Sequence, residues 1–110
     1  MSDLNLGEFE QMVLLAIIRL DGEVYGVPIC DEIERCTGRE TSPAAVYVTL
    51  RRLEDKGLVS SWMSEPVHER GGKPRRCVRV EKPGLKALRE SRRRLDALWR
   101  GLDPALKDVR

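Results

Sequence analysis

The sequence predicts a mostly α-helical fold with a small β-hairpin, followed by one long C-terminal helix. Apolar residues recur at helical spacing in three segments before Gly57, the pattern becomes extended between residues 59 and 81, and helical spacing returns from Pro83. A chain of 110 residues can bury one small core but not two. Doubly wound nucleotide-binding folds and barrel enzymes need roughly twice this length, which excludes both classes.

The first two helices are expected to form most of the core. In the expected helix Glu8–Leu20, apolar residues occur on almost every side of the helix axis, as is typical of a helix surrounded by other elements. Asp21–Gly22 ends this helix. A second helix is expected to begin near Val27–Pro28, because proline is tolerated in a first turn, and to stop at Thr37–Gly38.

The third expected helix has the clearest start signal. Ser42 can accept free amide hydrogens as the N-cap, Pro43 follows at the first helical position, and Gly57 closes the helix after Lys56. One narrow stripe is expected to face the core, made of Val46, Leu50 and Leu53. The opposite face is expected to carry Ala44, Ala45, Val48, Arg51, Arg52 and Asp55, with Tyr47 and Thr49 at its edges.

Two short, partly β-branched segments after the third helix predict a hairpin with a long polar tip. The expected strands are Val59–Met63 and Cys77–Glu81. Val78 and Val80 share one face of the second strand, and Arg79 points the other way. We therefore expect the hairpin to bury a single face.

The final helix is expected from Pro83 to Leu102, with apolar residues at alternating three- and four-residue steps if Arg92 fills the one missing position. This stripe is longer than so small a domain needs. A second copy of the chain, related by a two-fold axis, is therefore expected to cover it. The residues expected at this interface are Leu85, Leu88, Leu95, Leu98, Trp99 and Leu102.

The order helix, helix, helix, hairpin, helix is that of a winged helix-turn-helix followed by a dimerisation helix. The first is expected to comprise residues 1–81, and the dimerisation helix and tail residues 82–110. In such an arrangement the third helix can lie in the DNA major groove while the hairpin tip, or wing, lies along the backbone or in the minor groove.

The distribution of charge agrees with a bound polyanion. The net charge of +2 conceals an asymmetry: residues 1–48 hold three basic and nine acidic residues, whereas residues 49–110 hold seventeen basic and nine acidic residues. This division favours a polyanion on one face, although two solvated helix faces would give the same count.

The candidate DNA contacts at and on the third helix are Ser42, Ala44, Ala45, Val48, Arg51, Arg52 and Lys56. The small side chains allow close approach and could touch a thymine methyl group, and the basic ones can neutralise phosphates. Arg51 or Arg52 could instead read a guanine, and the alternative for both is an ordinary solvated helix face. The candidate contacts on the wing are Arg70, Lys73, Arg75, Arg76 and Arg79, a cluster that packing does not explain.

Five segments, in this order, resemble one known family. They are Leu6–Ala16, Tyr25–Ile29, Ser42–Leu50, Arg52–Val59 and Gly71–Arg76. Together they resemble the PadR-type winged-helix transcriptional regulators, and the resemblance covers nearly the whole chain.

The resemblance implies a homodimeric, DNA-binding repressor whose C-terminal helix supplies most of the dimer contact. It further implies that the helix from Ser42 to Lys56 enters the major groove, with Tyr47 at the DNA surface and the wing on the backbone. Members with one short C-terminal helix often answer to small hydrophobic or phenolic effectors. Trp99 near a two-fold axis could stack a flat aromatic effector, or it could be one more apolar anchor of the dimer interface.

Other functions find less support in the sequence. A winged helix can also serve as a protein-interaction module, whose basic wing would bind an acidic partner without DNA. No nucleophile elbow, HExxH pattern or phosphate-binding glycine loop is present, so we expect no enzyme and no cofactor. Neither Cys-x-x-Cys nor paired histidines occur, so we expect no metal site.

The cysteines and the lengths of the apolar runs indicate the cellular compartment in which the protein is expected. Cys30, Cys36 and Cys77 make an odd count without a signal peptide, which favours reduced thiols and a cytoplasmic protein. Cys30 and Cys36 are expected to be small core residues, with redox sensing as the alternative, whereas the arginines around Cys77 could lower its pKa and make it reactive. The longest apolar run, Met12–Ile18, is much shorter than the about 20 residues that a membrane helix requires. Trp62 is expected to pack on the hairpin rather than stack on a ligand.

Overall fold

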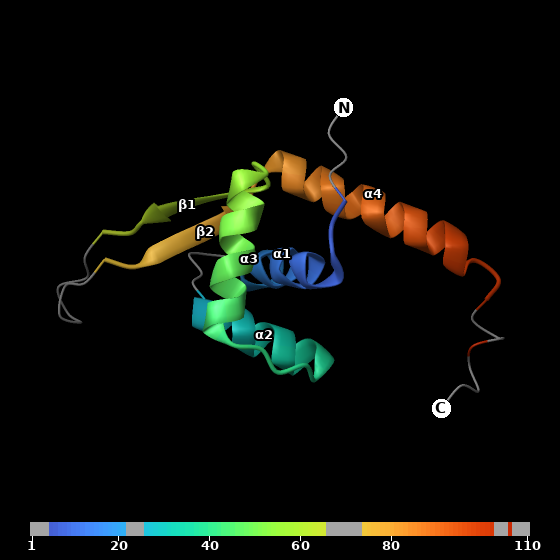
Figure 1. Ribbon diagram of the computed structural model, residues 1–110, viewed down its shortest axis with the longest axis horizontal. Coiled ribbons are helices and arrows are strands. Elements are labelled where there is room, and N and C mark those ends of the chain that lie inside the picture. Colours follow the sequence, from blue (N-terminus) through green and yellow to red (C-terminus); the bar gives the residue numbers. More distant parts are fainter. Residues whose placement is uncertain (1–4, 22–25, 66–73, 103–105, 107–110) are drawn as a thin grey trace.

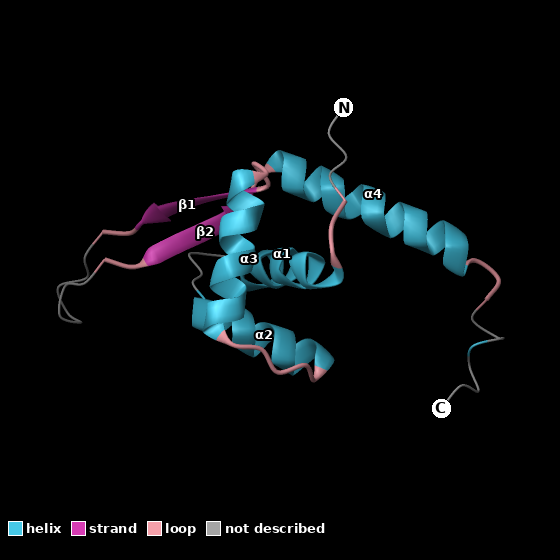
Figure 2. Cartoon of the chain, viewed as in Figure 1, coloured by secondary structure: helices cyan, strands magenta, loops and turns pink. Residues whose placement is uncertain are grey.

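The computed structural model describes residues 5–21, 26–65, 74–102 and 106. Over these residues the chain forms helices α1 (Glu8–Leu20), α2 (Gly26–Thr37) and α3 (Pro43–Asp55), strands β1 (Val59–Met63) and β2 (Arg76–Val80), and helix α4 (Lys82–Trp99). Figures 1 and 2 show α1 and α2 behind and below α3, the hairpin to one side, and α4 along the opposite edge. The predicted mostly α-helical fold with one hairpin and a C-terminal helix is confirmed.

The core is centred on α1, which packs against α2, α3, β2 and α4. Val13 and Leu14 of α1, Ile29 of α2, and Val46 and Leu53 of α3 are completely buried. Burial of each such side chain contributes about 1.5–3 kcal/mol to folding. The nearly all-apolar circumference of α1 predicted a helix covered on every side. α1 is central to the core, but its Leu15 and Ile18 are 49% and 42% exposed.

Both ends of α3 are fixed by local hydrogen bonds. The Ser42 hydroxyl accepts the backbone N–H of Ala45 at 3.1 Å, which confirms the predicted N-cap. At the other end Gly57 adopts a positive φ of 76°, and the N–H of Leu58 donates to the carbonyl of Leu53 at 2.9 Å. This Schellman motif ends the helix and turns the chain directly into β1.

The hairpin is antiparallel, with Val59 opposite Val80 and Trp62 opposite Cys77. Strand β2 begins at Arg76 and ends at Val80, one residue earlier at each end than predicted. Helix α2 begins at Gly26, and α4 ends at Trp99 rather than at residue 102.

Helix α4 approaches the start of β1 so closely that only glycine fits at position 84. A Cβ atom on Gly84 would lie 2.5 Å from the carbonyl oxygen of Leu58 and 2.8 Å from Cγ1 of Val80. Ala87 and Ser91 continue the same buried face of α4 toward α1. Gly84 therefore sets how closely α4 packs on the rest of the domain.

Three further expectations about burial are wrong. Thr49, expected at the edge of the outer face, is only 5% exposed, because α3 packs against α1, α2 and β1 and so buries a wider face. Cys77 is 2% exposed although it does not share the face of Val78, so the hairpin does not bury one face alone. Cys36, expected in the core, is exposed at the end of α2.

Candidate nucleic-acid interface

The outer face of α3 is solvent-exposed. Ala44, Ala45, Val48, Arg51 and Arg52 are all exposed, and Val48 is 57% exposed. Tyr47 is half-buried at the edge of this face. Neither arginine makes an ion pair with any residue in the described part of the chain. The face therefore combines small side chains, one exposed valine and two available guanidinium groups.

Ser42 and Lys56, at the two ends of the predicted DNA-binding segment, already have partners within the protein. The Ser42 hydroxyl caps α3, and the Lys56 ammonium donates to Oε2 of Glu10 at 2.9 Å. The other carboxylate oxygen of Glu10 accepts the N–H of Gly7 at 2.9 Å. Burial alone would raise the pKa of Glu10, but the hydrogen bonds from Lys56 and Gly7 outweigh it and hold that pKa below its ordinary value.

The described part of the wing begins at Pro74, so Arg70 and Lys73 lie outside the described residues. The backbone of Arg75 is tied across the hairpin: its N–H donates to the Ser64 hydroxyl at 3.0 Å, and its carbonyl accepts the Ser64 N–H at 2.7 Å. The Arg75 residue itself is exposed. The backbone that carries this arginine is therefore held in place.

Arg76 connects the wing to α3. Its guanidinium lies 3.6 Å from Oε1 of Glu54 and donates to the Ser61 hydroxyl at 3.3 Å. The Ser61 hydroxyl in turn donates to Oε2 of Glu54 at 2.9 Å. This three-residue bridge positions the hairpin relative to the C-terminal half of α3.

Arg79 is also braced within the hairpin. Its guanidinium lies 5.5 Å from the centre of the Trp62 ring, within the range of a cation–π contact. Its Nε atom donates to Glu81 at 3.2 Å, and Glu81 also accepts a hydrogen bond from the Ser60 hydroxyl. These two hydrogen bonds lower the pKa of Glu81, and the hydrogen bond from Ser60 has the larger effect. Trp62 therefore packs against a hairpin side chain, as predicted.

A shallow hollow separates α3 from the hairpin. It is lined by the apolar residues Leu50, Val59 and Val78, together with Arg51 and Arg76. Cys77 and Tyr47 also line this hollow, and Cys77 is only 2% exposed. A thiol this buried lacks the partial exposure that reactive cysteines have, so the expected reactivity of Cys77 is not supported.

Helix α4 presents a row of uncovered apolar side chains. Leu88 is half-buried against the core, but its neighbours along the helix are exposed. These are Leu85 (43%), Leu95 (48%), Leu98 (73%) and Trp99 (49%), and Leu102 (47%), which follows the end of α4, extends the row. In Figure 1 the C-terminal half of α4 extends beyond the other helices. This row contains every residue that the sequence predicted for the dimer interface.

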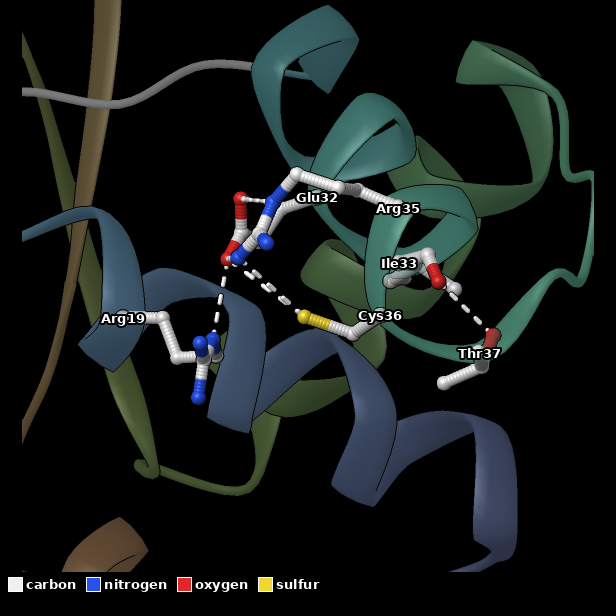
Figure 3. Close-up of polar contacts among 6 residues, drawn as sticks. All are labelled: Arg19, Glu32, Ile33, Arg35, Cys36 and Thr37. Carbon is white, nitrogen blue, oxygen red and sulfur yellow. Dashed lines mark hydrogen bonds and ion pairs between the residues drawn. The ribbon is translucent and has the colours of Figure 1, made fainter.

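A polar cluster joins α1 to α2 (Figure 3). Glu32 accepts hydrogen bonds from Arg35 at 2.5 Å and from Arg19 at 2.9 Å, and these lower its pKa to about 2. The Cys36 sulfur lies 3.6 Å from Glu32 and 3.4 Å from Arg35. This cluster explains why Cys36 stays at the surface: its thiol takes part in a solvent-exposed polar network.

Within the described residues no group of three or more His, Cys, Asp or Glu side chains could hold a metal ion. Over the same residues, the search for a helix long and apolar enough to cross a membrane finds none.

A model of a known protein family matches most of the chain. The family described as "Transcriptional regulator PadR-like family" matches residues 14–90 of this chain. A curated relative, "Transcriptional regulator Rv3488" of Mycobacterium tuberculosis, is 40% identical over 80 residues, which cover 73% of this chain and 70% of the relative.

Solved structures have the same fold. A PadR-like transcriptional regulator from Bacillus cereus superposes with a TM-score of 0.71 at 19% identity, covering 89% of this chain and 90% of that one. A PadR family transcriptional regulator from Eggerthella lenta superposes with a TM-score of 0.66 at 26% identity, covering 94% and 88% of the two chains.

Proposed function

Because the chain belongs to the PadR-like family of transcriptional regulators, we propose that it binds operator DNA as a homodimer, with α3 in the major groove and the wing on the flanking backbone. The observation that carries the proposal is the outer face of α3, which has no packing role. Ala44, Ala45 and Val48 leave room for base edges there, and Arg51 and Arg52 lie on the same helix for phosphate or guanine contacts.

The proposed interface differs in part from the residues that the sequence singled out. Ser42 and Lys56 act mainly by positioning α3, one as the N-cap and the other through Glu10. Arg75 contacts phosphate, whereas Arg76 and Arg79 hold the hairpin in place and contribute charge at its surface. Arg70, Lys73 and Tyr47 remain proposed contacts.

The exposed apolar row of α4 supports the proposed dimer. A row of large apolar side chains left in water is unfavourable, and tryptophan and leucine at such positions are typical interface anchors. A second copy related by a two-fold axis would cover the row with its own and would present two α3 helices to successive major grooves. In this proposal residues 1–81 bind DNA, and residues 82–110 dimerise.

We further propose that the protein represses transcription and that a small hydrophobic or phenolic effector relieves repression. Trp99 is the residue proposed to contact it, because the tryptophan is half-exposed in the apolar row and would lie near its symmetry mate. The chain also contains Trp62, so the proposed test is to titrate such compounds into a Trp62→Phe variant while following tryptophan fluorescence and DNA affinity. Compounds that quench Trp99 without weakening DNA binding would contradict the effector role.

A pair of matched double variants tests the proposed DNA interface. Arg51→Gln with Arg52→Gln removes two charges from the outer face of α3, and Arg19→Gln with Arg35→Gln removes two from the cluster of Figure 3. Binding to a random duplex should be salt-sensitive and at least micromolar at low salt, and the α3 variant should lower the salt slope by about two units. If both variants bind like the unmodified protein, or if no duplex is bound, the interface is wrong.

A further inference from the structure

Helix α4 carries a second basic surface that the proposed contacts of α3 and the wing do not use. The helix holds six basic and two acidic residues, from Lys82 to Trp99. Lys82, Lys86, Arg89 and Arg93 follow one another at steps of four, three and four, which places them within about 60° of one another around the helix. All four are exposed, and they form a row about 16 Å long, here called the α4 ridge.

The α4 ridge points away from the rest of the domain. The buried face of α4, made of Gly84, Ala87 and Ser91, packs toward α1, and the ridge lies on nearly the opposite side of the helix. Leu85 borders the ridge, three residues after Lys82, but the rest of the apolar row lies about 80° or more around the helix from it, so the proposed dimer would leave most of the ridge exposed. In Figure 1 α4 runs along one edge of the molecule, and α2 and the N-terminal end of α3 lie toward the other.

The charges of the ridge are unfavourable for the helix itself. Neighbours three or four residues apart on the ridge carry like charges, which destabilises a helix. Lys82 and Lys86 also stand in the first two turns of α4, at the positive end of the helix dipole, and no acidic residue occupies the first turn. The described contacts compensate little: Arg93 pairs with Glu90 at 2.9 Å, but no ion pair joins Lys82, Lys86 or Arg89 to a described residue.

We propose that the α4 ridge binds the phosphate backbone of a second duplex segment, so that one dimer can bridge two stretches of DNA. This extends the proposed function and depends on it. A straight row of lysine and arginine side chains suits a duplex, whose backbone offers closely spaced phosphates and requires no particular sequence. DNA held by α3 also keeps further duplex at high effective concentration near the ridge. The ridge contains no apolar side chain, which disfavours insertion into a lipid surface.

A bridging assay tests the proposal with the full chain. A biotinylated random duplex on beads is incubated with the protein and a second, fluorescent duplex, and the captured fluorescence is measured. The ridge variant, Lys86→Gln with Arg89→Gln, should capture about fivefold less of the second duplex. It should bind a single short duplex within about threefold of the unmodified protein, since α3 is intact.

Matched variants identify which surface bridges. Arg92→Gln with Arg94→Gln removes two charges from α4 outside the ridge and should leave capture nearly unchanged. In the absence of DNA the ridge variant should melt at the same temperature as the unmodified protein or higher, because like-charge repulsion is relieved. A lower melting temperature together with lost capture would mean that the variant merely damages the fold, which would overturn the proposal.

The results that would contradict the ridge proposal differ from those that would contradict the proposed function. If the protein binds one duplex but captures no second one, or if the ridge variant captures as much as the unmodified protein, the ridge proposal is wrong and the α3 interface stands. If no duplex is bound at all, both are wrong. If the ridge variant instead loses binding to phosphatidylserine vesicles while bridging is intact, the ridge is a membrane-facing surface.

Discussion

Lys56, just after α3, donates a hydrogen bond to Glu10, in the first turn of α1, at 2.9 Å. The carboxylate of Glu10 is almost completely buried, and the Lys56 side chain is 31% exposed. The contact joins residues 46 positions apart and fixes the C-terminal end of the proposed recognition helix to the central helix of the core. The orientation of α3 relative to α1 therefore depends on this pair.

Replacing Glu10 by Gln should destabilise the fold, because the Lys56 ammonium would lose its charged acceptor. Hydrogen bonds to charged groups contribute about 1.5–3 kcal/mol to the free energy of unfolding. Because Lys56 is partly exposed, the expected loss lies at the lower end of a range of about 1–3 kcal/mol. Urea unfolding at neutral pH measures it. Glu8→Gln, which changes an exposed acid two residues away, is the control, and equal stability of the two variants would contradict the role of the pair.

The stabilisation by Glu10 should disappear in acid. The pKa of Glu10 in the folded protein lies below its ordinary value of 4.5. A group with a lowered folded pKa stabilises the fold above its unfolded pKa, and the contribution is lost as pH falls through the folded value. The stability difference between the unmodified protein and Glu10→Gln should therefore be full at neutral pH and shrink below about pH 4.5. A difference that grows on acidification would refute this assignment.

Replacing Gly84 by Ala should displace α4. The added Cβ would meet the Leu58 carbonyl oxygen at 2.5 Å, and a backbone atom at the start of a strand cannot move far. Overpacking of this kind costs about 1–3 kcal/mol. Gly26→Ala is the control, because a Cβ there meets nothing within 4 Å and its expected effect is below about 1 kcal/mol. Thermal melting compares them, and equal melting temperatures would show that the close approach is not needed.

The two neighbouring arginines at the start of β2 should behave differently. Arg75→Gln should lower the salt slope of DNA binding by about one unit and leave the hairpin in place. Arg76→Gln removes the bridge to Glu54 and should also weaken the binding that remains at high salt, since the wing is no longer held against α3. Fluorescence anisotropy across a salt series measures both quantities. Identical behaviour of the two variants would mean that the bridge does not position the wing.

Alkylation of the native protein should modify Cys36 first. Cys36 is exposed, whereas Cys30 and Cys77 are buried, and burial raises the pKa of the Cys30 thiol. Iodoacetamide labelling followed by mass spectrometry should therefore show one fast site, which Cys36→Ser removes. A fast site that survives this substitution would place a second thiol at the surface.

Local signals in the sequence predict the fold well where they act over a few residues. Ser42, Pro43 and Gly57 determine the bounds of α3 through a cap, a restricted φ and a Schellman motif, all of which depend on adjacent residues. The apolar pattern of α1 likewise predicts its central position. The exposed apolar row on α4 follows directly from helical spacing.

Contacts between distant segments were not predictable in the same way. The pairs Lys56–Glu10 and Arg76–Glu54 join elements whose relative placement depends on packing, so both basic residues look like free phosphate ligands in the sequence alone. Thr49 is buried because three elements cover α3. For Glu10, its position three residues after Gly7 is a capping signal that could have indicated a structural role.

Hydroxyl-radical footprinting on an operator selected from the source genome tests the central claim most directly. A dimer that joins through α4 and reads DNA with two α3 helices should protect two symmetric half-sites with centres about 10–10.5 base pairs apart, or a multiple of that spacing. Leu95→Glu with Leu98→Glu, which places charges in the apolar row, should abolish the paired protection. A single unsymmetrical half-site, or paired protection that survives this variant, would contradict the account.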